Sequence, residues 1–108
     1  MRMIFDIESI RALCARNTLT ISDKVYDKIE SRRITPRHVR MAIMNGEIIE
    51  VYPDEQPDPR LLIVGCIADN KPLHVVIAID DWSIRLVSAY QPDPDRWESD
   101  FRTRKAVK

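Results

Sequence analysis

Glycine and cysteine are scarce in this 108-residue sequence, which contains two of each. The chain therefore has no glycine-rich loop to hold nucleotide phosphates, and it also has no GxSxG or HExxH motif. Cys14 and Cys66 form no CxxC pair, which argues against a structural zinc site. Each cysteine lies in an apolar pattern, so we expect two reduced, buried thiols. On these grounds we predict no metal and no cofactor.

A surplus of either charge is also missing, because 17 Lys and Arg residues balance 17 Asp and Glu residues. Domains that bind nucleic acid through its phosphates usually carry a basic surplus, so any basic patch here must be balanced elsewhere. No apolar run approaches the roughly 20 residues that cross a bilayer. Asp6 interrupts the apolar start where a signal peptide would continue. We therefore expect no membrane segment and a cytoplasmic location.

Length and composition predict one domain over residues 1–108. Apolar residues make up 44% of the chain, which is enough for one hydrophobic core at this size. The chain changes character near Gly46, from a helical pattern before it to alternating β-branched residues after it. We expect helices over about 6–46, a sheet over about 47–90 and a tail over 91–108.

The first part carries helix-capping residues. Apolar residues at three- and four-residue steps predict a helix from about Asp6 to Arg16. Ser22 is suited to cap a second helix. Thr35-Pro36 begins a third helix, which ends at Asn45-Gly46 because glycine readily takes a left-handed cap.

The second part predicts strands over about 47–52, 61–68, 73–79 and 82–90, with short connections that make neighbours antiparallel. A two-residue turn at Asp80-Asp81 would put Ile77 opposite Ile84 on the face beneath the helices. His74 and Arg85 would then share the other face, with Gly65 beside the histidine. The predicted fold class is α+β, with N-terminal helices packed on one face of a four-stranded antiparallel sheet.

Two residues of the predicted sheet have side chains suited to acid–base chemistry. His74 lies mid-strand and could act as general acid or base beside Arg85, or could be a structural histidine that forms a hydrogen bond. Tyr90 ends the last strand and could stack on a base, or could pack the tail. His38, in the first turn of a helix, is more typical of a solvated surface histidine.

Arginines gather around the connection between the second and third predicted helices. Such a basic patch suits RNA or an acidic partner surface, and a solvated face is the alternative. Its members are Arg32, Arg33, Arg37 and Arg40.

Several ordered motifs resemble a bacterial domain-of-unknown-function family often encoded beside a YgiT-type (MqsA-like) zinc-finger protein. The resemblance extends from about residue 6 to residue 104. The motifs are Arg33-Ile34-Thr35, Asn45-Gly46-Glu47-Ile48-Ile49-Glu50, Arg60-Leu61-Leu62-Ile63-Val64-Gly65, Pro72-Leu73-His74-Val75-Val76 and Tyr90-x-Pro92-Asp93-x-x-x-Trp97.

The resemblance implies a toxin–antitoxin pair with a small zinc-finger antitoxin as partner, and a fold similar to RelE-like and MqsR-like toxins. Such toxins cut messenger RNA without a metal, using the 2′-hydroxyl of the RNA as nucleophile. On that likeness His74 would be the acid or base, and Tyr90 would stack or donate a proton. Arg33, Arg60 or Arg85 would hold the scissile phosphate.

A second hypothesis is a non-catalytic protein-interaction module, or a degenerate toxin that still binds its antitoxin. Relatives often begin the second helix with a Ser-x-His-Ala-like motif, whereas this chain has Ser22-Asp23-Lys24-Val25. A mechanism with two histidines is therefore not available. The balanced charge also favours this second hypothesis over an RNA-cutting enzyme.

Overall fold

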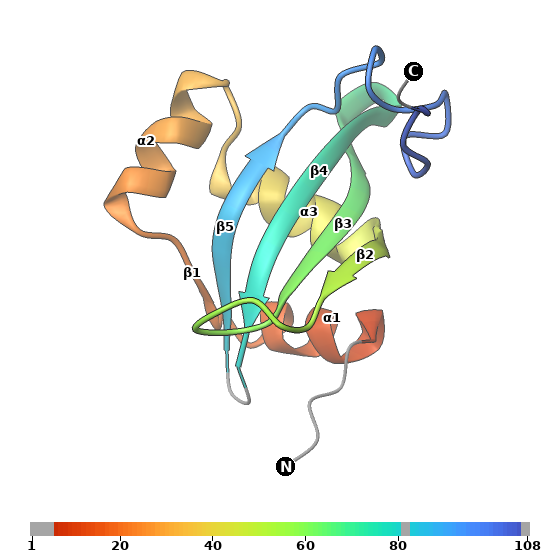
Figure 1. Cartoon of the computed structure of the whole chain (residues 1–108). Helices are drawn as coiled ribbons and strands as arrows, with labels where there is room; N and C mark the ends of the chain where they lie inside the picture. The colour runs from red at the N-terminus through yellow and green to blue at the C-terminus, as the bar shows by residue number, and fades with distance from the viewer. Residues whose placement is uncertain (1–5, 81–82, 107–108) are drawn as a thin grey trace.

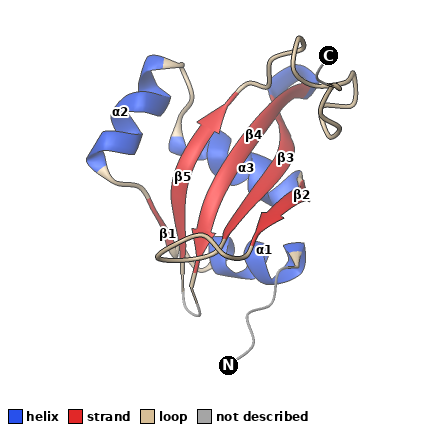
Figure 2. Cartoon of the chain, viewed as in Figure 1, coloured by secondary structure: helices blue, strands red, loops and turns tan. Residues whose placement is uncertain are grey.

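The computed structural model describes residues 6–80 and 83–106. Over these residues the chain forms three α-helices, a short 3-10 helix and five strands, and the helices precede most of the sheet (Figures 1 and 2). The α-helices are α1 (Ile7–Ala15), α2 (Asp23–Ser31) and α3 (Pro36–Asn45), and the 3-10 helix is η1 (Ala68–Asn70). The strands are β1 (Leu19–Thr20), β2 (Glu47–Tyr52), β3 (Arg60–Ile67), β4 (Lys71–Ile79) and β5 (Ile84–Tyr90).

The fold is α+β as predicted, but its sheet is mixed and contains five described strands instead of four antiparallel ones. The strand order is β1-β5-β4-β3-β2, and β2 to β5 form an antiparallel meander. The added strand, β1, pairs in parallel with β5. Two residues are too few for an alternating pattern to indicate a strand, so only the pairing with β5 identifies β1.

The helices begin where the capping residues predict. The side chains of Asp6, Ser22 and Thr35 accept hydrogen bonds from the backbone N–H groups of Ser9, Val25 and His38. Each bond satisfies an N–H that has no partner within the helix, which sets the start of the helix within a residue of its predicted position.

Both glycines of the chain allow α3 to approach β3. A Cβ at Gly65 would lie 2.2 Å from the carbonyl oxygen of Ala42, and a Cβ at Gly46 would lie 2.4 Å from the same atom. Gly46 has an extended backbone with φ −95° and ψ −177°, so the predicted left-handed cap is wrong. The glycines are needed here for close approach of the backbones.

The predicted register of the last hairpin is also wrong. Ile79 pairs with Ile84 and Ile77 pairs with Leu86, so the connection is longer than the expected two-residue turn. Trp82, predicted to begin the last strand, lies outside the described residues. The shift is by two residues, so it keeps each of these side chains on its predicted face.

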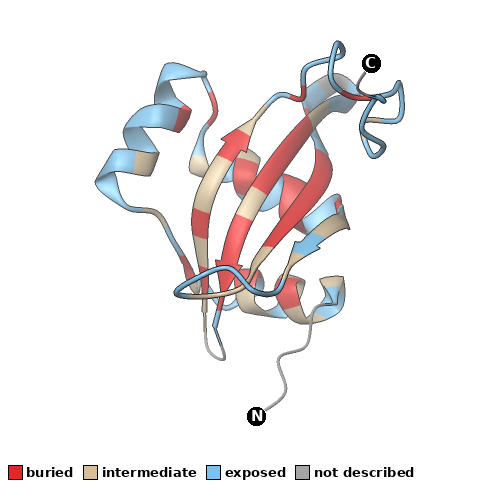
Figure 3. Ribbon diagram, in the orientation of Figure 1, coloured by how far each residue is buried: buried red, intermediate tan, exposed pale blue. Residues whose placement is uncertain are grey.

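The hydrophobic core lies between the helices and one face of the sheet, which we call the inner face. Figure 3 shows buried residues along β3, β4 and the side of α3 toward the sheet, while α2 is largely exposed. Helix residues such as Ile10, Ile29 and Ile43 pack with the inner-face residues Ile63 and Ile77. None of the described helices is long and apolar enough to cross a membrane.

The tail folds back on itself and packs against the sheet. The backbone N–H of Glu98 donates to the carbonyl of Thr103 at 2.8 Å, and that of Lys105 donates to the carbonyl of Arg96 at 2.9 Å. Trp97 and Arg104 form an antiparallel bridge between these two bonds. We call residues 96–105 the C-terminal hairpin.

Candidate functional site on the outer face of the sheet

The face of the sheet turned away from the helices, here called the outer face, carries four of the eight predicted site residues, namely His74, Tyr90, Arg60 and Arg85. On adjacent strands, Val64 of β3 pairs with His74 of β4, and His74 pairs with Tyr90 of β5. Further along the same strands, Arg60 pairs with Ala78, and Ala78 pairs with Arg85. Residues paired in this way point to the same face, so the predicted residues form two groups on one surface.

His74 is completely buried, although it lies on the outer face. Its Nε2–H donates to the carbonyl oxygen of Phe101 at 2.7 Å. The Trp97 ring packs edge-on against the imidazole, with the two ring centroids 4.5 Å apart and the planes at 89°. The C-terminal hairpin therefore covers this histidine.

Burial also determines the charge of His74. Loss of water around the imidazole lowers its pKa, and the bond to the Phe101 carbonyl opposes that effect only in part. Nδ1 has no hydrogen-bond partner among the described residues. With Nε2 as the donor, a neutral ring leaves a lone pair on Nδ1.

Tyr90 lies beside His74, with ring centroids 5.4 Å apart. Burial raises the pKa of its phenol, so the hydroxyl keeps its proton at neutral pH. The positive charge of Arg32 acts on Tyr90 from the end of α2, where the Arg32 guanidinium donates to the carbonyl oxygen of Ala89 at 2.9 Å. The structure thus brings together two of the three predicted catalytic residues, and it holds one predicted arginine on Ala89, the residue before Tyr90.

Arg85 is not beside His74, in contrast to the prediction. Its cross-strand partner, Ala78, lies four residues from His74 along β4, which is roughly 13 Å in a strand. Arg85 instead pairs with Asp58 at 3.3 Å. In Figure 1 the loop that carries Asp58 crosses in front of the sheet at this end. The β3–β4 hairpin also departs from its predicted register, by one residue, so Gly65 pairs with Leu73 instead of lying beside His74.

The remaining predicted arginines lie apart from the imidazole. Arg60 accompanies Arg85 on the outer face, half-buried. Arg33, Arg37 and Arg40 are exposed on the connection between α2 and α3 and on α3 itself. These three remain candidates for a binding surface only.

Sequence reasoning missed a group of residues that links β2 to the C-terminal hairpin. Arg104 donates to both carboxylate oxygens of Glu50, at 2.8 and 3.0 Å, and its guanidinium lies 4.6 Å from the centre of the Trp97 ring. The hydroxyl of Tyr52 donates to the same carboxylate. These bonds, chiefly that from Arg104, lower the pKa of Glu50. Glu50 and Arg104 are 54 residues apart in the sequence, and no local pattern relates them.

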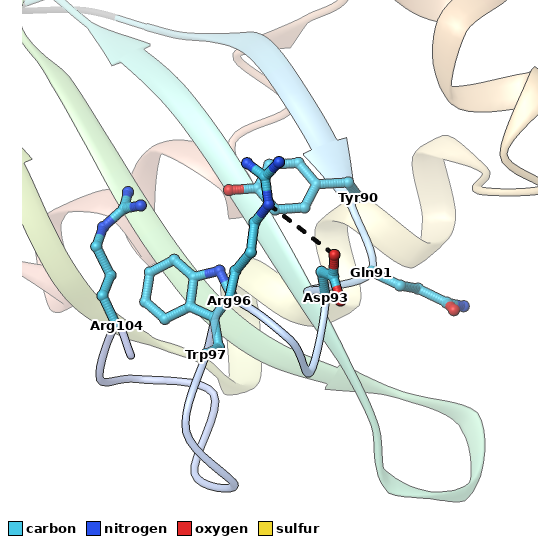
Figure 4. Close-up of a pocket in the computed structure, with 6 residues that line it drawn as sticks. All are labelled: Tyr90, Gln91, Asp93, Arg96, Trp97 and Arg104. Carbon is cyan, nitrogen blue, oxygen red and sulfur yellow. Dashed lines mark ion pairs between the residues drawn. The ribbon is translucent and has the colours of Figure 1, made fainter. Parts of the chain in front are cut away.

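A hollow of about 270 Å³ opens beside Tyr90, between the end of β5 and the C-terminal hairpin. Figure 4 shows the Tyr90 hydroxyl pointing toward the side of the hollow where Trp97 and Arg104 lie. The dashed line marks the ion pair between Arg96 and Asp93, whose atoms are 4.0 Å apart. Gln91 and Arg104 complete its lining. Because Arg96 pairs with Asp93 and Arg104 pairs with Glu50, both arginines of the hollow are already balanced.

The two cysteines have different surroundings. Cys14 is buried in the core, and burial raises the pKa of its thiol. Cys66 is exposed, so the prediction of two buried thiols is wrong for this residue. Among the residues that the structure describes, no group of three or more His, Cys, Asp or Glu side chains could hold a metal ion.

A family model described as a domain of unknown function, DUF4258, matches residues 21–91. The chain belongs to this family. Comparison with curated proteins and with solved structures gives no match. The DUF4258 match includes α2, α3 and strands β2 to β5, and therefore His74, Tyr90 and Glu50. It ends at Gln91, before the hairpin that covers the histidine.

Proposed function

We propose that this DUF4258 chain is a RelE-like toxin domain that cleaves messenger RNA without a metal ion. Its activity is neutralised by a small protein partner of the zinc-finger antitoxin type. The observation that carries the proposal is the adjacency of His74 and Tyr90 on the outer face, with ring centroids 5.4 Å apart. One ring offers a lone pair at Nδ1 and the other a phenolic proton, which are the two groups that acid–base catalysis requires.

When the 2′-hydroxyl of RNA attacks the adjacent phosphate, one proton must be removed from that hydroxyl and one must be supplied to the departing 5′-oxygen. His74 takes the proton from the 2′-hydroxyl, the 2′-oxygen attacks the adjacent phosphorus, and a 2′,3′-cyclic phosphate forms. The bond to the 5′-oxygen breaks, and Tyr90 gives that oxygen its proton. Arg32, whose guanidinium donates to the carbonyl oxygen of Ala89 at 2.9 Å, provides positive charge at this end of β5 for a phosphate. Arg60 and Arg85, farther along the strands, hold phosphates of the same RNA away from the scissile bond.

Purified protein incubated with varied single-stranded RNAs, with and without ribosomes, tests this function. We expect cleavage by the wild type and its loss in His74→Gln and Tyr90→Phe. Tyr26→Phe is the matched control, because Tyr26 is 43% exposed on α2 and away from the sheet. Since Trp97 covers His74, the assay includes Trp97→Ala. RNA left intact by both the wild type and Trp97→Ala would refute the nuclease function.

The complete burial of His74 favours a second candidate, a non-catalytic module or degenerate toxin that binds its partner. In this function His74 serves only to hold the C-terminal hairpin. Induction of His74→Ala in a bacterial host would then affect growth as the wild type does. Charge reversal at Arg85, or in the patch that includes Arg37 and Arg40, would abolish complex formation. A pull-down with the wild type that recovers no partner would contradict this candidate.

A further inference from the structure

The C-terminal hairpin contacts two strands of the outer face. Trp97 is 4% exposed and packs on His74 of β4, and the Phe101 carbonyl accepts the bond from that imidazole. On β2, Glu47 forms an ion pair with Arg102, and Glu50 forms the two-bonded pair with Arg104. The hairpin thus covers His74 and the carboxylate of Glu50 at once.

The contacts that hold the hairpin to the sheet run through side chains. The backbone bonds of Glu98 and Lys105 close the hairpin on itself. The Glu47–Arg102 ion pair is open to solvent, with side chains 61% and 45% exposed, and such a pair contributes little to stability. In the bidentate Glu50–Arg104 pair the glutamate side chain is only 23% exposed. This pair, the buried Trp97 and the imidazole bond therefore provide most of the anchoring. Such a segment can open without unfolding the core.

The backbone of the hairpin is also in an uncommon conformation where it meets His74. Phe101 has φ 56°, in the left-handed region that is unfavourable for residues other than glycine. The same residue supplies the carbonyl oxygen that accepts the hydrogen bond from the His74 imidazole. Opening the hairpin would allow Phe101 to leave this left-handed conformation. The relief of that backbone strain favours release of the hairpin from the sheet.

We propose that the C-terminal hairpin is an autoinhibitory strap, closed over His74 in this structure, and that it must open before RNA reaches the imidazole. This inference rests on the proposed function for its consequence, but the opening itself can be measured without any RNA. In the closed state the ring is fully buried and its Nε2 is bonded to Phe101. In the open state both the imidazole and the Tyr90 ring face solvent.

Diethyl pyrocarbonate, which acylates accessible neutral imidazoles, measures the opening in the full chain. The chain has two histidines, and His38, which is partly exposed, serves as the internal reference. We expect His74 to react far more slowly than His38 in the wild type, with the sites assigned by peptide mass mapping. In Trp97→Ala, His74 should react roughly tenfold to hundredfold faster, because the main apolar anchor is lost. Equal rates at the two histidines in the wild type would overturn the proposal.

A charge swap at Glu47 and Arg102 provides variants that leave the core and the proposed catalytic residues intact. Glu47→Arg and Arg102→Glu should each speed acylation of His74 by about two- to fivefold, as expected for an exposed ion pair. The double variant, which restores the pair in reverse, should return the rate toward that of the wild type. Protection of His74 that is unchanged in all three variants and in folded Trp97→Ala would overturn the strap.

RNA cleavage by the same variants separates this inference from the proposed function. Cleavage that rises in step with His74 reactivity supports both. An accessible His74 with intact RNA overturns the proposed function and leaves the opening of the hairpin established. Cleavage that is no faster when His74 is accessible, in a chain whose wild type cuts RNA, overturns autoinhibition alone.

Discussion

Acidification should destabilise the fold between pH 6.5 and pH 4.5 because His74 is buried in its neutral form. Burial lowers the pKa of His74 below its ordinary value of 6.5. In the unfolded chain the imidazole regains that ordinary value, so below pH 6.5 the unfolded state binds a proton that the folded state does not. The free energy of unfolding therefore falls as the pH drops, until the pH reaches the lowered pKa of the folded state.

The size of the effect follows from one proton. When one proton binds only to the unfolded state, the free energy of unfolding falls by about 1.4 kcal/mol for each pH unit. Between pH 6.5 and pH 4.5 the loss of stability caused by His74 is therefore at most roughly 2.7 kcal/mol. That is a large share of the roughly 5–15 kcal/mol that stabilises a typical domain. The lowered pKa values of Glu47 and Glu50 act in the same direction, but chiefly near and below their ordinary value of 4.5. The window above pH 4.5 therefore separates the imidazole from these carboxylates.

Urea unfolding of the wild type and His74→Gln, in steps from pH 7.5 to pH 4.5, is the assay. Glutamine keeps an N–H for the Phe101 carbonyl but does not titrate, so the wild type should lose stability on acidification relative to His74→Gln. His38→Gln removes the other histidine and should keep the pH slope caused by His74. Parallel curves for the wild type and His74→Gln across the window would refute the reasoning, since the imidazole would then titrate alike in both states.

Three further predictions concern the fold. Gly65→Ala should destabilise the protein by about 3 kcal/mol in urea unfolding, because the alanine Cβ would lie 2.2 Å from the Ala42 carbonyl oxygen. An unchanged urea midpoint would contradict the close approach of α3 to β3. Arg33→Gly should raise the free energy of unfolding by roughly 0.5–1 kcal/mol, because Arg33 follows α2 with φ 61°, a left-handed conformation that glycine adopts more easily. A loss of stability would show that contacts of the arginine side chain outweigh this backbone strain. With Ellman's reagent, Cys66 should react at once and Cys14 only on unfolding, so Cys66→Ser should abolish the fast phase.

Features that depend on a few neighbouring residues were predictable from the sequence. Thr35 and Pro36 start α3 because a side-chain oxygen and a fixed φ act within one helical turn. The bounds of β2 were predicted as residues 47–52, where helix-ending and proline signals lie on either side. The register of β4 on β5 was predicted wrongly, because it depends on the length of a connection that the apolar pattern does not specify.

For the candidate site, the sequence indicated His74 and Tyr90 by residue type and position in a strand. It also indicated Arg85 as a neighbour of His74, which the tertiary structure contradicts by placing Arg85 further along the sheet, paired with Asp58. The sequence did not mark Glu50 as a candidate site residue, because a carboxylate in an edge strand is usually a solvated side chain. Its role became visible only when the chain brought Arg104 to it.

The sequence by itself determined where the three α-helices and the four longer strands form, and that one apolar face must be buried. These properties arise from caps, turns and side-chain periodicity, whose physical range is a few residues. Only the tertiary structure decided that β1 joins the sheet and that the C-terminal hairpin covers His74. Those contacts join segments far apart along the chain and depend on how the whole core packs, which no local pattern encodes.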